Sequence, residues 1–257
     1  MFPLRRFLRA LSRRARALSG QGGVLALWRY YSPFRPLGVV ETGAPAQADT
    51  LVIFLPGIED SAEDFHAQGF PQALRARFPG ARCVALDAHL GYYLTRRIVR
   101  CLHEEIVRPA RAAGVRRVVL VGVSMGALGA LLYLRAHPRE VQGLVLMAPF
   151  LGRDWRIRRF AARPDRPRAE EGFEQSLWAC LLAQVDAGLP VCLAYGGGDR
   201  MQTEQGLLAA RLPEASVWRA QGGHAWTTWA GLWLQLLTDE RGLAQALFSD
   251  EGWRGLS

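Results

Sequence analysis

Ser124 stands where an apolar run gives way to a segment rich in small residues, within the stretch RRVVLVGVSMGALGALLYLRAHP. The run Val118–Val123 is short, continuous and rich in valine, which predicts a buried strand. Leucines at roughly helical spacing follow the serine and predict a helix over Met125–His137. Gly122 and Gly126 flank Ser124, and such glycines relieve crowding in a tight strand-to-helix turn that projects the serine Oγ from a sheet. The serine is therefore a candidate nucleophile, the alternative being a glycine-rich turn with a helix N-cap serine.

A serine hydroxyl is a weak nucleophile unless a base takes its proton, so an acid and a base are expected elsewhere in the chain. Asp199 lies in GGGDR, directly after the predicted strand 191–195. His224 lies in QGGHAWTTW, after the predicted strand 216–218. Catalytic groups gather at the carboxyl ends of the strands in open parallel sheets. The order Ser124, Asp199, His224, with each residue after a separate strand, predicts a Ser-Asp-His site.

The sequence resembles the α/β-hydrolase superfamily from about Val39 to Leu247. The resemblance rests on the strand LVIFLPG and on the segments GVSMG, YGGGD and GGHAW, which occur in the family's order. It implies that Ser124 is the nucleophile, that His224 moves its proton, and that Asp199 orients and stabilises the imidazole. It further implies an oxyanion hole formed by the backbone N–H groups of Met125 and Ile58. The chain has Pro56-Gly57 where the family commonly has His-Gly, which matters little because the donor is main chain.

Other acidic residues and histidines also lie near the predicted strand ends or loops. Asp87 also follows a predicted strand and is the alternative acid. His89, in DAHLGYY, is expected to line the pocket. Glu59 and Asp60 are expected to be solvated or helix-start residues, and the pair Ser61 and Asp64 resembles a helix cap. The remaining histidines are expected to be ordinary surface or partly buried side chains: His66, His103 and His137.

Strands and helices alternate along the chain from residue 38, which predicts an α/β fold with a mainly parallel sheet covered by helices on both faces. The predicted strands are 39–41, 51–55, 82–86, 118–123, 141–147, 191–195 and 216–218. The predicted helices are 63–78, 95–113, 125–137, 203–212 and one from about 227. The chain is therefore divided into an arm, residues 1–37, and one α/β-hydrolase domain, residues 38–257.

The segment of about 150–188 separates two predicted strands and is too long for an ordinary connection, so it is expected to form a short cap. Residues 153–168 hold seven arginines and two aspartates, which could favour an anionic group on a substrate or form a solvated face. Trp155 and Trp178 could supply an apolar wall for the pocket, and Trp226 is a further candidate for substrate contact.

The arginines are concentrated at the N-terminus: residues 1–40 hold eight of them and no acidic residue. In residues 1–20 the leucines and Phe7 fall on one face of a helix and most arginines on the other. Such an arm could bind an anionic membrane surface, pack on the domain itself, or act in targeting. No nucleic-acid-binding motif accompanies the positive charge, so no nucleic-acid partner is expected.

Four cysteines without CxxC spacing favour reduced thiols and, weakly, a cytoplasmic location, with membrane association through the arm left open. Neither a metal nor a cofactor is expected, because no metal-ligand spacing and no GxGxxG after a first strand occurs. The resemblance and the site together predict a serine hydrolase that cleaves a small-molecule or lipid-like carboxylic ester or thioester through an acyl-enzyme. The alternatives are an acyltransferase with the same residues and a non-catalytic binding protein of this fold.

Overall fold

The computed structural model describes residues 36–43, 48–152 and 173–249. Their centre is a seven-stranded sheet in the order β1-β3-β2-β4-β5-β6-β7, in which only β1 runs antiparallel to its neighbour. The strands are β1 (Gly38–Thr42), β2 (Thr50–Leu55), β3 (Ala81–Asp87), β4 (Arg117–Val123), β5 (Gly143–Met147), β6 (Val191–Gly196) and β7 (Val217–Ala220). The seven predicted strands and the mainly parallel sheet are confirmed.

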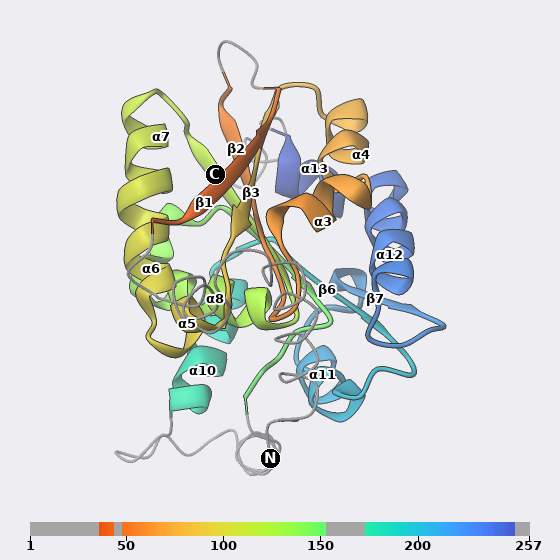
Figure 1. Cartoon of the computed structure of the whole chain (residues 1–257). Helices are drawn as coiled ribbons and strands as arrows, with labels where there is room; N and C mark the ends of the chain where they lie inside the picture. The colour runs from red at the N-terminus through yellow and green to blue at the C-terminus, as the bar shows by residue number, and fades with distance from the viewer. Residues whose placement is uncertain (1–35, 44–47, 153–172, 250–257) are drawn as a thin grey trace, which may run out of the picture.

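Helices cover both faces of the sheet (Figure 1). One face carries α5 (Leu90–Leu94), α6 (Arg97–Cys101), η1 (Leu102–Val107), α7 (Arg108–Ala112), α8 (Met125–Ala136) and α10 (Phe173–Asp186). The other face carries α3 (Ala62–Ala67), α4 (Phe70–Arg77), α12 (Trp226–Thr238) and α13 (Leu243–Phe248). The other helical segments among the described residues are α11 (Gln202–Ala209) and the short 3-10 turns η2 (Pro138–Glu140) and η3 (Glu214–Ser216).

Each face of the sheet has its own hydrophobic core. Along β2, Leu51, Ile53 and Leu55 point into the core under α5–α8, whereas Val52 and Phe54 point into the core under α3, α4 and α12. All six residues of β2 are buried, as the period of two predicts for a strand covered on both sides. The two cores fix the strands, and thereby the loops at their carboxyl ends.

Two of the predicted helices are divided in the structure. The predicted helix 63–78 is two helices, because Gly69 adopts a left-handed φ of 73° and Pro71 lies in the first turn of α4. The predicted helix 95–113 contains the π-helical segment η1 just before Pro109, whose missing N–H interrupts the α-helical hydrogen bonds. The short helix α5 was not predicted.

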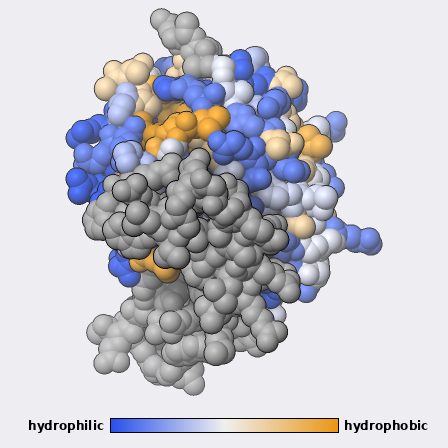
Figure 2. Space-filling view, in the orientation of Figure 1, coloured by the Kyte–Doolittle hydropathy of each residue, from blue (hydrophilic) through white to orange (hydrophobic). Residues whose placement is uncertain are grey.

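Residues 153–172, most of the predicted cap, and residues 1–35, nearly all of the predicted arm, lie outside the described residues. The described part of the insertion, which connects β5 to β6, includes α10, and this helix packs against α8. Within the described ranges, no helix is both long and apolar enough to cross a lipid bilayer. Figure 2 shows mostly hydrophilic atoms on the described part of one face, with a hydrophobic patch among them.

Candidate active site

Ser124 occupies a strained turn between β4 and α8. Its φ of 53° and ψ of −110° lie in a region that side-chain-bearing residues rarely adopt. Two backbone hydrogen bonds hold the turn: Ser124 N–H donates to the Met147 carbonyl at 2.9 Å, and Phe150 N–H donates to the Ser124 carbonyl at 3.0 Å. The turn is therefore fixed against the end of β5 as well as by its own strand and helix.

The glycines on each side of Ser124 are required by close packing. A Cβ atom at Gly122 would lie 2.5 Å from Ala127 Cα. A Cβ atom at Gly126 would collide with the Leu55 carbonyl oxygen and lie 2.7 Å from that of Pro56. The glycine pattern predicted from the sequence thus has a physical cause, since α8 begins in direct contact with the end of β2.

His224 lies between Ser124 and Asp199 in one chain of hydrogen bonds. Its Nε2 is 2.9 Å from Ser124 Oγ, and its Nδ1 is 2.7 Å from Asp199 Oδ2. The Asp199 side chain is fully buried, and the His224 side chain is 10% exposed. This arrangement lets the imidazole take a proton from the serine while the carboxylate holds its other nitrogen.

Backbone contacts bring the acid loop and the histidine loop together. Gly197 and Gly198 N–H donate to the carbonyls of Ala220 and Gly222, each at 2.8 Å. The second carboxylate oxygen of Asp199 accepts from Met201 N–H at 2.8 Å, which fixes the rotation of the carboxylate. The predicted acid is thus in place beside His224, and Asp87, the alternative acid, lies at the end of β3 instead.

The loop after β2 lies directly beside Ser124. A Cβ atom at Gly57 would be 3.4 Å from Ser124 Cβ. Tyr93 Oη donates a buried hydrogen bond to the Pro56 carbonyl at 2.8 Å and so anchors this loop to α5. Ile58 directly follows Gly57 in this loop, and Met125 directly follows Ser124. The two predicted oxyanion donors therefore belong to backbone segments that lie side by side.

Tyr93 was not singled out from the sequence, although it bears on the geometry of this loop. Burial, followed by the nearby charges of Asp60 and Asp87, raises the Tyr93 pKa well above its ordinary value, so the hydroxyl stays protonated and donates throughout the usual pH range.

Tyr93→Phe should leave the Pro56 carbonyl without its buried donor. We expect a loss of about 1–3 kcal/mol in the free energy of unfolding. We also expect about a tenfold or larger fall in kcat, since a shift of about 1 Å in a positioned group can cost up to ~10²-fold. Urea denaturation and steady-state kinetics measure the two effects. Tyr133→Phe is the matched control, because it removes a buried hydroxyl that pairs with His103 and not with the loop. An equal loss of kcat in both variants would contradict the positioning role.

The residues predicted to contact substrate differ in their burial and in their neighbours. His89 is buried at the start of α5, where its Nδ1 accepts from Gly91 N–H at 3.1 Å and its ring packs on Tyr92. Trp178 is 2% exposed within the core that α10 shares with α8, which gives it a packing role. Trp226 is half-buried, and its indole N–H donates to Asp60 Oδ1. Trp155 lies outside the described residues.

The predicted cap of α3 is confirmed, since Ser61 N–H donates to Asp64 Oδ2 at 2.7 Å. Asp60 lies directly before the Ser61 N-cap, as expected for a helix-start residue, and it is half-buried rather than fully solvated. Burial raises its pKa to about 6. No signal in the sequence pointed to its hydrogen bond with Trp226.

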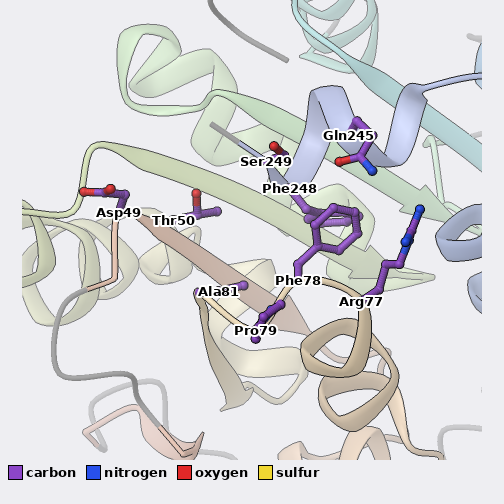
Figure 3. A pocket seen from close by; sticks show the side chains of 10 residues that line it. Asp49, Thr50, Arg77, Phe78, Pro79, Ala81, Gln245, Phe248 and Ser249 are labelled. Atoms are coloured by element: carbon purple, nitrogen blue, oxygen red, sulfur yellow. The ribbon is translucent and has the colours of Figure 1, made fainter. Parts of the chain in front are cut away.

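Away from the site, a cavity of about 360 Å³ opens at the amino-terminal ends of β2 and β3 (Figure 3). It is lined by Asp49, Thr50, Arg77, Phe78, Pro79, Gly80, Ala81, Gln245, Phe248 and Ser249. It lies at the opposite end of the parallel strands from Ser124 and shares no residue with the site. Nowhere in the described part of the chain do three or more His, Cys, Asp or Glu side chains gather as a metal ion would require.

Part of the chain matches a known protein family: residues 50–169 match the alpha/beta hydrolase fold family. No curated protein matches the chain by sequence.

Solved structures of similar shape agree with that match. A ferulic acid esterase has a TM-score of 0.56 and 12% identity, over 82% of this chain and 98% of its own. A thioesterase domain from the curacin biosynthetic pathway has a TM-score of 0.51 and 17% identity, over 77% and 94%. The S-formylglutathione hydrolase of Staphylococcus aureus has a TM-score of 0.52 and 12% identity, over 77% and 82%. Identities this low compare folds and not activities. Together with the sheet order and the family match, they show that this chain is a protein of the alpha/beta hydrolase fold.

Proposed function

We propose that the protein is a serine hydrolase that cleaves carboxylic esters or thioesters through an acyl-enzyme. One observation carries the proposal: the unbroken hydrogen-bond chain from Asp199 through His224 to Ser124 Oγ. A buried serine with a purely structural role requires only one hydrogen-bond partner for its hydroxyl. Here the partner is an imidazole whose second nitrogen is paired with a fully buried carboxylate, which is the arrangement of a catalytic base.

In the first half of the reaction, His224 Nε2 takes the proton from Ser124 Oγ as the oxygen attacks the substrate carbonyl carbon. The carbonyl double bond opens to a tetrahedral oxyanion, which the backbone N–H groups of Ile58 and Met125 would stabilise. The intermediate then collapses, the bond to the leaving group breaks, and His224 delivers its proton to the departing alcohol or thiol. The acyl group remains on Ser124.

In the second half, water replaces the leaving group. His224 takes a proton from water, the hydroxide attacks the acyl carbon, and Ser124 regains its proton as the acid is released. Asp199 accepts a hydrogen bond from His224 Nδ1–H and stabilises the imidazolium that forms twice in each cycle. Every step uses side chains that are within hydrogen-bond distance of one another before substrate binds.

For the substrate we propose only a broad class, an ester or thioester. Solved structures of similar fold include a ferulic acid esterase and a thioesterase domain, which supports acyl chemistry on an ester or thioester. The basic amphipathic pattern of residues 1–20 would bring such an enzyme to an anionic lipid surface, which favours a lipid-like acyl substrate. A small-molecule ester is the alternative.

A fluorophosphonate probe tests the proposal directly, because it modifies only an activated serine. We expect one probe per chain by intact mass, located at Ser124 by peptide mapping, together with hydrolysis of esters of graded acyl length. Ser216→Ala, which alters a serine at the amino-terminal end of β7, the opposite end of that strand from the His224 loop, should be labelled like the parent. Absence of labelling would contradict the proposal. Product formation only with an added acceptor alcohol would indicate an acyltransferase.

A further inference from the structure

Asp60 joins two loops of the candidate site that are far apart in the sequence. It lies in the loop after β2, directly before the Ser61 N-cap of α3, and its Oδ1 accepts from the Trp226 indole N–H at 2.9 Å. Its other oxygen, Oδ2, lies against Gly57, so that a Cβ atom at Gly57 would collide with it. The same imagined atom would be 3.4 Å from Ser124 Cβ. The Asp60 carboxylate and Ser124 therefore both lie next to Gly57.

Trp226 follows His224 by two residues and begins α12. Its ring packs edge-on against Phe65, Phe70 and Trp229, with ring centroids 5.1–5.6 Å apart. Trp229 in turn lies edge-on to the His224 imidazole, 4.9 Å away. The position of the histidine loop is therefore set by aromatic packing and by the hydrogen bond to Asp60.

The surroundings of Asp60 disfavour its charge. Burial raises its pKa to about 6, and the charges of Asp64 and Glu59 add to this. The Trp226 hydrogen bond and the nearby His224 act in the opposite direction. The charge of Asp60 also contributes to the raised pKa of Tyr93, which anchors the same loop. A carboxyl in such a place lowers the stability of the fold at neutral pH, and a residue chosen for packing alone would be uncharged.

We propose that Asp60 is a positioning residue of the active site, whose hydrogen bond to Trp226 holds the oxyanion loop and the histidine loop in register. The inference rests on the proposed serine hydrolase. Asp60 and Trp226 act by fixing the positions of Ile58 and His224, and neither contacts the reacting atoms. Trp226, which the sequence predicts to contact substrate, donates its only N–H to Asp60.

The test uses the second-order rate of fluorophosphonate labelling, which needs both loops in place but no knowledge of the substrate. At pH 8 we expect Asp60→Ala and Trp226→Phe each to slow labelling by about tenfold or more. The double variant should be no slower than the slower single variant, because both changes remove the same bond. Asp60→Asn keeps an oxygen that can accept from Trp226 and should stay within about threefold of the parent. Glu63→Gln, which neutralises an exposed carboxylate on α3, is the matched control.

Thermal melting of Asp60→Asn gives a second readout. The pKa of Asp60 in the folded protein lies above its ordinary value of 3.8, so the ionised form is disfavoured by folding. That cost is fully present above pH 6 and fades as the pH falls towards 3.8. Asp60→Asn should therefore raise the melting temperature at pH 8, and the difference from the parent should shrink at pH 4.5.

The outcomes separate the inference from the function on which it rests. If the parent is not labelled, the proposed function fails and the inference fails with it. If the parent is labelled and Asp60→Ala and Trp226→Phe react at its rate, only the inference is overturned. Losses that multiply in the double variant would mean that the two side chains act independently, and would also overturn it.

Discussion

Ser124→Ala is expected to lower kcat for ester hydrolysis by about 10⁶-fold, the loss typical of removing the nucleophile of such a triad. The reason is chemical: no acyl-enzyme can form, and His224 Nε2 has no serine hydroxyl from which to accept a proton. The residual rate should still exceed the rate in water by about 10³–10⁴, because the backbone donors and the binding site remain. Steady-state kinetics with an activated ester, together with intact-mass labelling, measures both quantities.

The fold should survive this change, since alanine keeps the backbone and removes one oxygen. A melting temperature close to that of the parent is the control, because Ser124 is held in its strained turn by backbone hydrogen bonds that alanine can also make. If the alanine variant kept more than about 1% of the parent's activity, the nucleophile would have to lie elsewhere. The proposed mechanism would then be wrong.

The elements that position the site could be predicted from the sequence because their patterns are strong. The central strands β2, β4, β5 and β6 are buried on both sides and appear as short apolar runs, such as LVIFL at Leu51–Leu55. Ser124 and Asp199 follow two of these strands and His224 follows the partly exposed edge strand β7, and parallel strands bring their carboxyl ends to one edge. Their proximity follows from the topology, although they are 100 and 25 residues apart.

The details that were missed depend on contacts between distant side chains. Nothing in GIEDS shows that an indole from α12 will meet the Asp60 carboxyl, because Trp226 lies 166 residues away. Likewise, Trp178 in a predicted cap suggested a pocket wall, whereas its helix packs on α8 and buries it. The break at Gly69 does have a local signal, the segment GFP. The prediction of one continuous helix over 63–78 followed the helical spacing and did not take this signal into account.

Asp199→Asn is the second change for which we expect a very large effect, a fall in kcat of about 10⁴-fold near neutral pH. Met201 N–H donates to Oδ1, so the asparagine would keep its oxygen there and turn its NH₂ towards His224 Nδ1. Nδ1 would then accept, the imidazole proton would move to Nε2, and Nε2 could no longer take the proton of Ser124.

Asp87→Asn is the matched control for this prediction, since Asp87 also ends a parallel strand and is the other acid that the sequence offered. We expect kcat within about threefold of the parent, because the two imidazole nitrogens of His224 are already paired with Asp199 and Ser124, and direct partners give the larger loss. Labelling rates with the fluorophosphonate should show the same contrast between the two variants. If Asp87→Asn were the more damaging change, the acid would be misassigned; if neither changed kcat, His224 would be acting without a carboxylate partner, and the buried Asp199 would serve only to hold its loop.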